Sequence, residues 1–94
     1  MKGKILEWAN ERGILNSDFK LKQYTKLQEE ANELLIAIVD DNKEEQADAI
    51  GDCYVVLTIL AWQLCLDIDD CIKGAYNEIK NRTGVLTNGT FIKD

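Results

Sequence analysis

The chain has 94 residues, 46% of them hydrophobic, and its 17 acidic and 11 basic side chains leave a net charge of −6. This charge argues against a nucleic acid polymer or an anionic membrane surface as partner, because both repel an acidic protein. The most apolar run, residues 53–62, is too short to span a bilayer, and no charged leader precedes an apolar stretch. We therefore expect one soluble, cytoplasmic domain over residues 1–94, with a core so small that a homodimer or homotetramer is favoured.

Cysteine usage is typical of a reducing compartment. The three cysteines are odd in number, none belongs to a C-x-x-C pair, and there is no histidine to complete a zinc site. We expect reduced thiols that pack as small hydrophobic side chains.

The first half of the chain predicts two helices. One runs over about residues 4–12 and is stopped by Gly13. The other runs over about residues 18–40, with Asn16 and Ser17 as capping candidates, and carries apolar residues at helical spacing.

Two further helices are predicted after the break at residues 40–42. Asn42, with Glu45 three residues later, resembles a capping box that opens a third helix reaching about residue 66. Asp67 can cap a fourth helix over about residues 68–82.

The C-terminal segment has a different pattern. Residues 85–92 place Asn88 and Gly89 between two β-prone triplets, which is a local hairpin signal. With four helices, short turns and no proline, the sequence predicts an all-α protein of the four-helix-bundle type, oligomeric, with a short C-terminal hairpin or extended tail.

Acidic side chains gather where the third helix becomes apolar. Since successive helical residues turn by about 100°, Glu45, Asp48 and Asp52 share one face, and Asp52 sits at the mouth of the apolar segment. A carboxylate there needs a cation, a hydrogen bond or a proton. On the second helix Glu30 and Glu33 lie about 60° apart, and an antiparallel turn would bring them level with Asp52.

Three or four oxygen ligands converging in this way suit Mg²⁺, with Mn²⁺ also possible, and such cations can bridge to the phosphates of a nucleotide. The spacing is equally compatible with a solvated acidic face that forms salt bridges to Lys22, Lys26 and Lys43.

Candidate substrate-binding residues lie elsewhere. On the fourth helix Lys73, Asn77 and Lys80 share a face and could hold phosphate oxygens, although a basic stripe that complements the helix dipole explains them as well. Trp8 is a candidate for stacking on a base, but aromatic residues at such spacings more often pack in a core, and the same holds for Tyr24, Tyr54, Trp62 and Tyr76.

The segment 26–34, KLQEEANEL, resembles the K-L-x-E-E-x-x-E-L signature of MazG-like all-α nucleotide pyrophosphohydrolases. Residues 48–52, DAIGD, are similar to that family's second acidic helix, and Lys73-x-x-x-Asn77-x-x-Lys80 is similar to its phosphate-facing motif. The end of the chain resembles the tail of its short stand-alone members, so the resemblance covers nearly the whole chain.

The resemblance implies a helical dimer or tetramer that cleaves nucleoside triphosphates, ribo- or deoxyribo-, into monophosphate and pyrophosphate. By position, Glu30 and Glu33 match the family's first ligand pair and Asp52 its last acid. The family usually has glutamate three residues before that aspartate, where this chain has Ala49. Asp48 is the nearest substitute as a metal ligand, and Glu45 is the next.

The expected mechanism uses metal held by Glu30, Glu33 and Asp52, and a water activated by the metal or by a spare carboxylate such as Glu29. Lys73, Asn77 and Lys80 would hold the leaving oxygens. The alternative is a non-catalytic helical oligomerisation or regulatory module that has kept the bundle and lost the chemistry, and Ala49 favours it.

Overall fold

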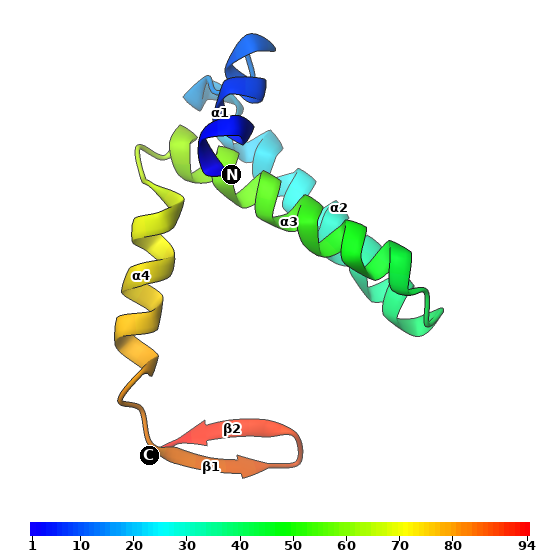
Figure 1. The fold of residues 1–94 in the computed structure, drawn as a ribbon, viewed down its shortest axis with the longest axis vertical. Coiled ribbons are helices and arrows are strands. Elements are labelled where there is room, and N and C mark those ends of the chain that lie inside the picture. Colours follow the sequence, from blue (N-terminus) through cyan, green and yellow to red (C-terminus); the bar gives the residue numbers. More distant parts are fainter.

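The computed structural model describes residues 1–94 as four α-helices, one 3₁₀ turn and a two-stranded antiparallel sheet (Figure 1). This confirms the all-α class with four helices and a short C-terminal hairpin. In chain order the elements are α1 (Lys2–Glu11), η1 (Ser17–Phe19), α2 (Lys20–Val39), α3 (Lys43–Gln63), α4 (Ile68–Ile79), β1 (Gly84–Thr87) and β2 (Thr90–Lys93).

Capping side chains stand at the start of η1, α3 and α4, whereas α1 and α2 begin without one. The Asn16 side chain accepts from the Asp18 amide at 2.8 Å and caps the 3₁₀ turn η1. This turn occupies the predicted start of the second helix, so α2 itself begins at Lys20. Asn42 accepts from the Glu45 amide at 3.1 Å and opens α3, as predicted. The predicted capping by Asp67 at the start of α4 is also confirmed.

Three helices end in the same way, with one residue in the left-handed region. Gly13, Asp41 and Cys65 have φ of 71°, 51° and 62°. In each case the next amide reaches back to a carbonyl five residues earlier, on Ala9, Ala37 and Ala61, at 3.0, 3.0 and 2.8 Å. The third helix was predicted to reach about residue 66, but this turn ends it at Gln63.

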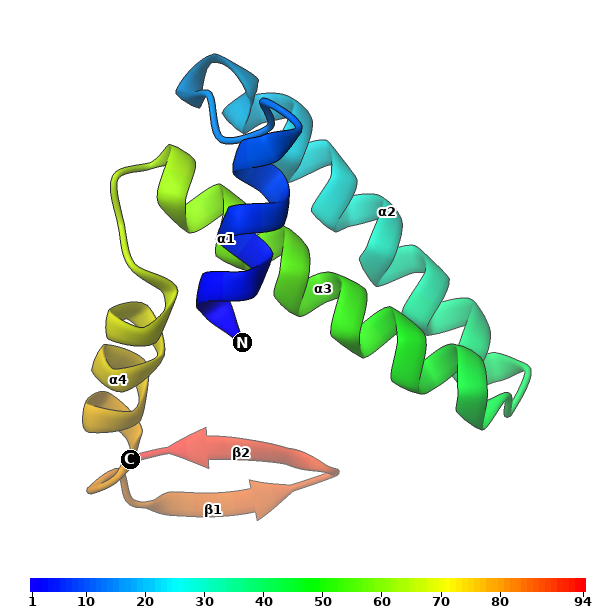
Figure 2. The same cartoon turned by 45° about the horizontal axis from the view of Figure 1, so that its top comes forward.

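Helices α2 and α3 form an antiparallel hairpin whose axes lie side by side over most of their length (Figures 1 and 2). Ala37 and Ala49 are buried in it together with the larger Val56 and Ile59. Small side chains at the contact let the two backbones approach closely, which brings polar groups of both helices within reach of one another. This hairpin carries the candidate site.

Helix α1 lies across α3, and its own residue Ala9 is fully buried. The Gln63 side chain donates a hydrogen bond of 2.8 Å to the Ile14 carbonyl and so joins the loop after α1 to the end of α3.

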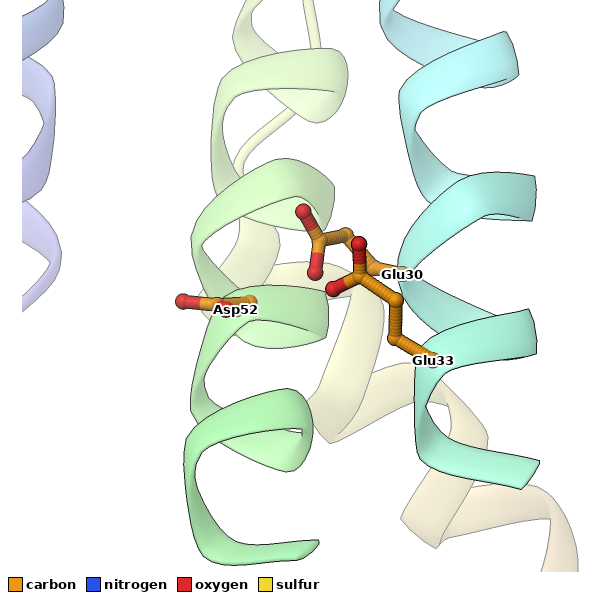
Figure 3. A group of neighbouring side chains, drawn as sticks. All are labelled: Glu30, Glu33 and Asp52. Carbon is orange, nitrogen blue, oxygen red and sulfur yellow. The ribbon is translucent and has the colours of Figure 1, made fainter. Parts of the chain in front are cut away.

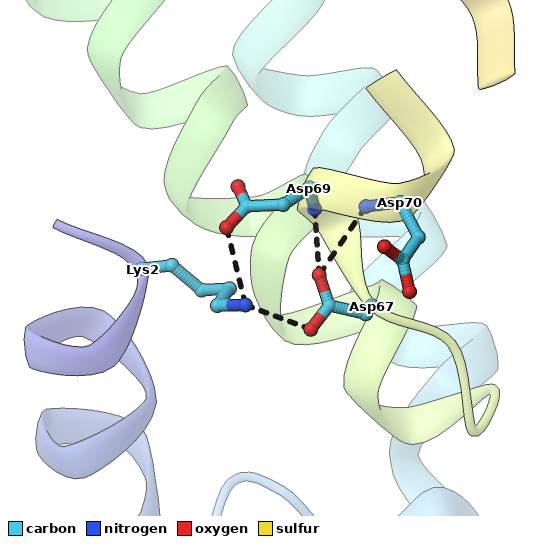
Figure 4. Close-up of polar contacts among 4 residues, drawn as sticks. All are labelled: Lys2, Asp67, Asp69 and Asp70. Atoms are coloured by element: carbon cyan, nitrogen blue, oxygen red, sulfur yellow. Dashed lines mark hydrogen bonds and ion pairs between the residues drawn. The ribbon is translucent and has the colours of Figure 1, made fainter. Parts of the chain in front are cut away.

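Helix α4 leaves the end of α3 at an angle of 104° and runs away from the α2–α3 hairpin, so the four helices do not close into a bundle within one chain (Figures 1 and 2). Its start is held by Lys2 of α1, whose ammonium lies 2.7 Å from Asp67 and 3.1 Å from Asp69 (Figure 4). Beyond this contact its apolar side chains are exposed, among them Ile72 and Tyr76. The predicted end near residue 82 is instead Ile79, because the chain turns there toward the hairpin.

The predicted hairpin is confirmed. Asn88 and Gly89, at φ of 52° and 80°, form its two-residue turn. The pairing runs from Thr87 opposite Thr90 to Gly84 opposite Lys93. A side chain at Gly84 would overlap the backbone of β2, which explains a glycine at the start of β1.

No single helix is long and apolar enough to cross a membrane. The consecutive helices α3 and α4 pass that test as a pair, on length and composition alone and across the 104° bend between them.

Candidate metal centre

Three carboxylates meet across the α2–α3 hairpin. Glu30 and Glu33 project from neighbouring turns of α2 toward α3, where Asp52 lies (Figure 3). One carboxylate oxygen of each side chain lies within 4.8 Å of the others. The convergence predicted from helical spacing and an antiparallel turn is therefore present in the structure.

Glu30 is the buried member of this cluster, with 5% of its surface exposed. Its Oε1 lies 3.3 Å from the ammonium of Lys26, while its Oε2 is buried with no hydrogen-bond partner. A buried carboxylate oxygen without a partner is costly, because it has lost water and gained nothing in return.

The electrostatics of the cluster favour an added positive charge. Burial raises the pKa of Asp52, and the negative charges of Asp48 and Glu30 raise it further. The pKa of Glu33 is also raised, chiefly by its hydrogen bond with Glu30 and by the charge of that residue. Lys26 opposes both shifts but does not cancel them.

The donor set fits a hard divalent cation. Glu30, Glu33 and Asp52 offer only oxygen ligands, and the unpartnered Oε2 of Glu30 gives the site a coordination position that no protein group satisfies. The cluster could therefore hold a divalent metal.

Asp48 and Glu45, predicted to replace the family's glutamate that is absent at Ala49, lie outside the group of three carboxylates. Ala49 is buried between the helices with 4% of its surface exposed. Asp48 is exposed and does not belong to the group of three, although its charge acts on Asp52. Glu45 lines a surface hollow of about 340 Å³ that Glu33 also lines. A metal-binding role for Asp48 or Glu45 stays a prediction.

Glu29 lies outside the cluster. Its side chain is 59% exposed and sits 3.7 Å from the ammonium of Lys26, which also contacts Glu30. Lys26 thus lies between Glu29, whose role as proton acceptor stays a prediction, and the buried carboxylate of Glu30.

The predicted phosphate-binding residues are not brought together with the carboxylates within one chain. Lys73, Asn77 and Lys80 are exposed on or just after α4, which lies apart from the hairpin (Figure 1). Helical spacing correctly gives their shared face, but it carries no information on where the helix points.

Trp8 does lie near the cluster. It lines a hollow of about 420 Å³ together with Asp52 and with Lys4, Ile5 and Val55. These last three residues were not predicted from the sequence. Their nearness depends on how α1 crosses α3, which a single sequence does not reveal.

Comparison with known proteins assigns the family. Residues 8–78 match the family described as phosphoribosyl-ATP pyrophosphohydrolase. The chain belongs to this family. The match includes α2, α3 and all three carboxylates of the cluster.

This family is an all-α relative of the MazG-like proteins, so the resemblance is supported at the level of the wider superfamily. A relative among curated proteins is an uncharacterized 18.2 kDa protein of the rep-hol intergenic region of Haemophilus phage HP1 (strain HP1c1). It is 38% identical over 63 residues, which cover 67% of this chain and 39% of the phage protein. No solved structure matches the chain.

Proposed function

We propose that this chain is a divalent-metal-dependent nucleotide pyrophosphohydrolase that converts a nucleoside triphosphate, ribo- or deoxyribo-, into its monophosphate and pyrophosphate. The observation that carries the proposal is the cluster of Glu30, Glu33 and Asp52, in which a buried oxygen has no partner. The family match supports hydrolysis of a phosphoric anhydride as the class of reaction.

In this proposal Glu30, Glu33 and Asp52 hold Mg²⁺, or Mn²⁺ in its place. The bound metal would screen the negative charges of the triphosphate and lower the pKa of an attacking water. Lys26 is charged and half exposed, so it can move from Glu30 to a phosphate oxygen when the metal takes over the carboxylates. Since the chain has no histidine, an exposed carboxylate, Glu29, would accept the proton from water.

We further propose that the active form is a homodimer or homotetramer in which α4 of one copy covers the α2–α3 hairpin of another. Two kinds of observation support this. Large apolar side chains are exposed on both parts, with Leu35 and Ile36 on α2 and Ile72 and Tyr76 on α4 all more than half exposed. Lys73 on α4 and Lys80 directly after it are also opposite in charge to the acidic cluster, so that with Asn77 these residues of one copy would reach the phosphates bound by another.

The second candidate is a non-catalytic helical module, and Ala49 favours it, because this buried position offers no carboxylate to a metal. Product analysis separates the two candidates. The purified chain is incubated with each nucleoside triphosphate and Mg²⁺, and the products are resolved by ³¹P NMR. We expect monophosphate and pyrophosphate in equal amounts, and none with chelator or with Asp52→Asn. Absence of products, together with no thermal shift by Mg²⁺ and nucleotide, would establish the module.

A further inference from the structure

Two surface hollows run along the contact between α1 and α3, and both reach Asp52. The first, of about 420 Å³, is lined by Lys4, Ile5, Trp8, Asp52 and Val55. The second, of about 490 Å³, shares Ile5, Asp52 and Val55 with the first and extends toward Tyr54. Because they share three lining residues, the two hollows are neighbours, and we call them together the α1–α3 groove.

The chemistry of the α1–α3 groove differs from that of the carboxylate cluster. Its walls near Asp52 are the apolar side chains of Ile5 and Val55, and the half-exposed indole of Trp8 lies at its edge. Lys4 adds one cationic donor. A mostly apolar hollow of several hundred Å³ with a few polar groups is typical of sites that take a flat organic ligand.

The indole of Trp8 is held in place from one side. The guanidinium of Arg12 lies 4.3 Å from the ring centroid and donates a hydrogen bond of 2.9 Å to the Trp8 carbonyl. One face of the ring is therefore covered by a cation, and a stacked ligand would use the other face. An aromatic ring fixed before binding loses little entropy when a ligand stacks on it.

Asp52 connects the two regions, because it is a member of the carboxylate cluster and also lines the groove. We propose that the α1–α3 groove binds the nucleoside part of the substrate, with its base stacked on Trp8, while the phosphates extend past Asp52 to the metal. The inference rests on the proposed function. It selects a nucleotide over an inorganic polyphosphate, since only a nucleotide would occupy both regions.

Intrinsic fluorescence tests the groove, because the chain has two tryptophans in different places. Trp8 lies in the groove, whereas Trp62 is similarly exposed and lines a separate hollow at the α3–α4 junction. The probes are an α,β-methylene nucleoside triphosphate for each common base, and tripolyphosphate, all with Mg²⁺. In Trp62→Phe, which keeps Trp8, we expect quenching by at least one nucleotide and none by tripolyphosphate. In Trp8→Phe, which keeps Trp62, we expect no change.

Affinity measurements on the intact chain complete the test. Trp8→Ala should weaken nucleotide binding by roughly 5- to 150-fold, the effect of losing one base–aromatic stack. It should leave tripolyphosphate binding unchanged, and Trp8→Phe should recover most of the nucleotide affinity. Unchanged binding of tripolyphosphate by Trp8→Ala also excludes misfolding as the cause.

Three results would overturn the inference. Nucleotide affinity that is unaffected by Trp8→Ala would place the base elsewhere while leaving the proposed function standing. A change in oligomeric state on Trp8→Ala would make the groove a contact between copies of the chain. Failure of the unaltered chain to bind either tripolyphosphate or nucleotide with Mg²⁺ would overturn the proposed function and the inference together.

Discussion

Replacing Glu30 with glutamine should affect stability in opposite directions with and without metal. In the metal-free protein the buried Oε2 of Glu30 has no partner and lies in a cluster of like charges. The substitution removes the charge, and the new amide can donate to the nearby carboxylate of Glu33. Metal-free Glu30→Gln should therefore be more stable than the unaltered chain.

The size of the effect follows from two contributions. A buried polar atom without a partner costs about 1–3 kcal/mol. The i,i+4 contact of Glu30 with the half-exposed Lys26, which the substitution weakens, is worth only about 0.3–0.5 kcal/mol. A net gain near 1 kcal/mol corresponds to a rise in Tm of about 4–8 °C for a domain of this size.

With metal bound, the unaltered chain should be more stable than Glu30→Gln. At ten times its Kd, a cation that binds only the folded chain adds about 1.4 kcal/mol, or about 6–11 °C in Tm. Glu30→Gln should lose this gain because it lacks a ligand. The assay is thermal unfolding by circular dichroism in chelator and in Mg²⁺, with Glu29→Gln as control, since Glu29 contacts the same lysine from outside the cluster. A Glu30→Gln chain that is less stable in chelator, yet gains as much from Mg²⁺ as the unaltered chain, would refute the reasoning.

Three further predictions concern other parts of the chain. Gly84→Ala should open the hairpin, because its Cβ would overlap the Ile92 carbonyl. Amide hydrogen exchange in β1 and β2 should become faster, while the helical circular dichroism signal stays the same. Unchanged protection of these amides would contradict the prediction. The ion pair with Lys2 lowers the pKa of Asp67, so its contribution to stability is present above the unfolded pKa and is lost as pH falls through the folded one. The stability difference between the unaltered chain and Asp67→Asn, measured by denaturant titration, should therefore shrink between about pH 5 and pH 2, and a constant difference would argue against the pair. Ala49→Glu should lower the stability of the metal-free protein, because it buries a charge. It should also tighten Mn²⁺ binding, as measured by calorimetry, and weaker binding would show that this position does not face the metal.

Much of the local structure could be predicted from the sequence, because it depends on short-range chemistry. Asn42 and Asp67 cap helices at the predicted positions, and Asn88 with Gly89 forms the predicted turn. The carboxylate cluster was also accessible, since helical spacing and one short antiparallel turn between α2 and α3 are enough to bring its members together.

The remaining features depend on how separate elements pack. The end of α3 was placed too late because Cys65 adopts a left-handed conformation that is uncommon for a side chain of its kind. The start of α4 is joined to α1 by the ion pair between Lys2 and Asp67, which are 65 residues apart. Neither that contact nor the crossing of α1 over α3, which forms the groove at Trp8, leaves a periodic signal in one sequence.

Binding of a divalent cation by Glu30, Glu33 and Asp52 can be measured by titration with Mn²⁺ followed by electron paramagnetic resonance. Free Mn²⁺ gives a strong signal that is lost on binding, so bound metal is counted without substrate or activity. We expect saturable binding by the unaltered chain and by Glu29→Gln, and loss of that binding in Asp52→Asn and Glu30→Gln. Equal Mn²⁺ binding by all four proteins would contradict the assignment of the metal centre.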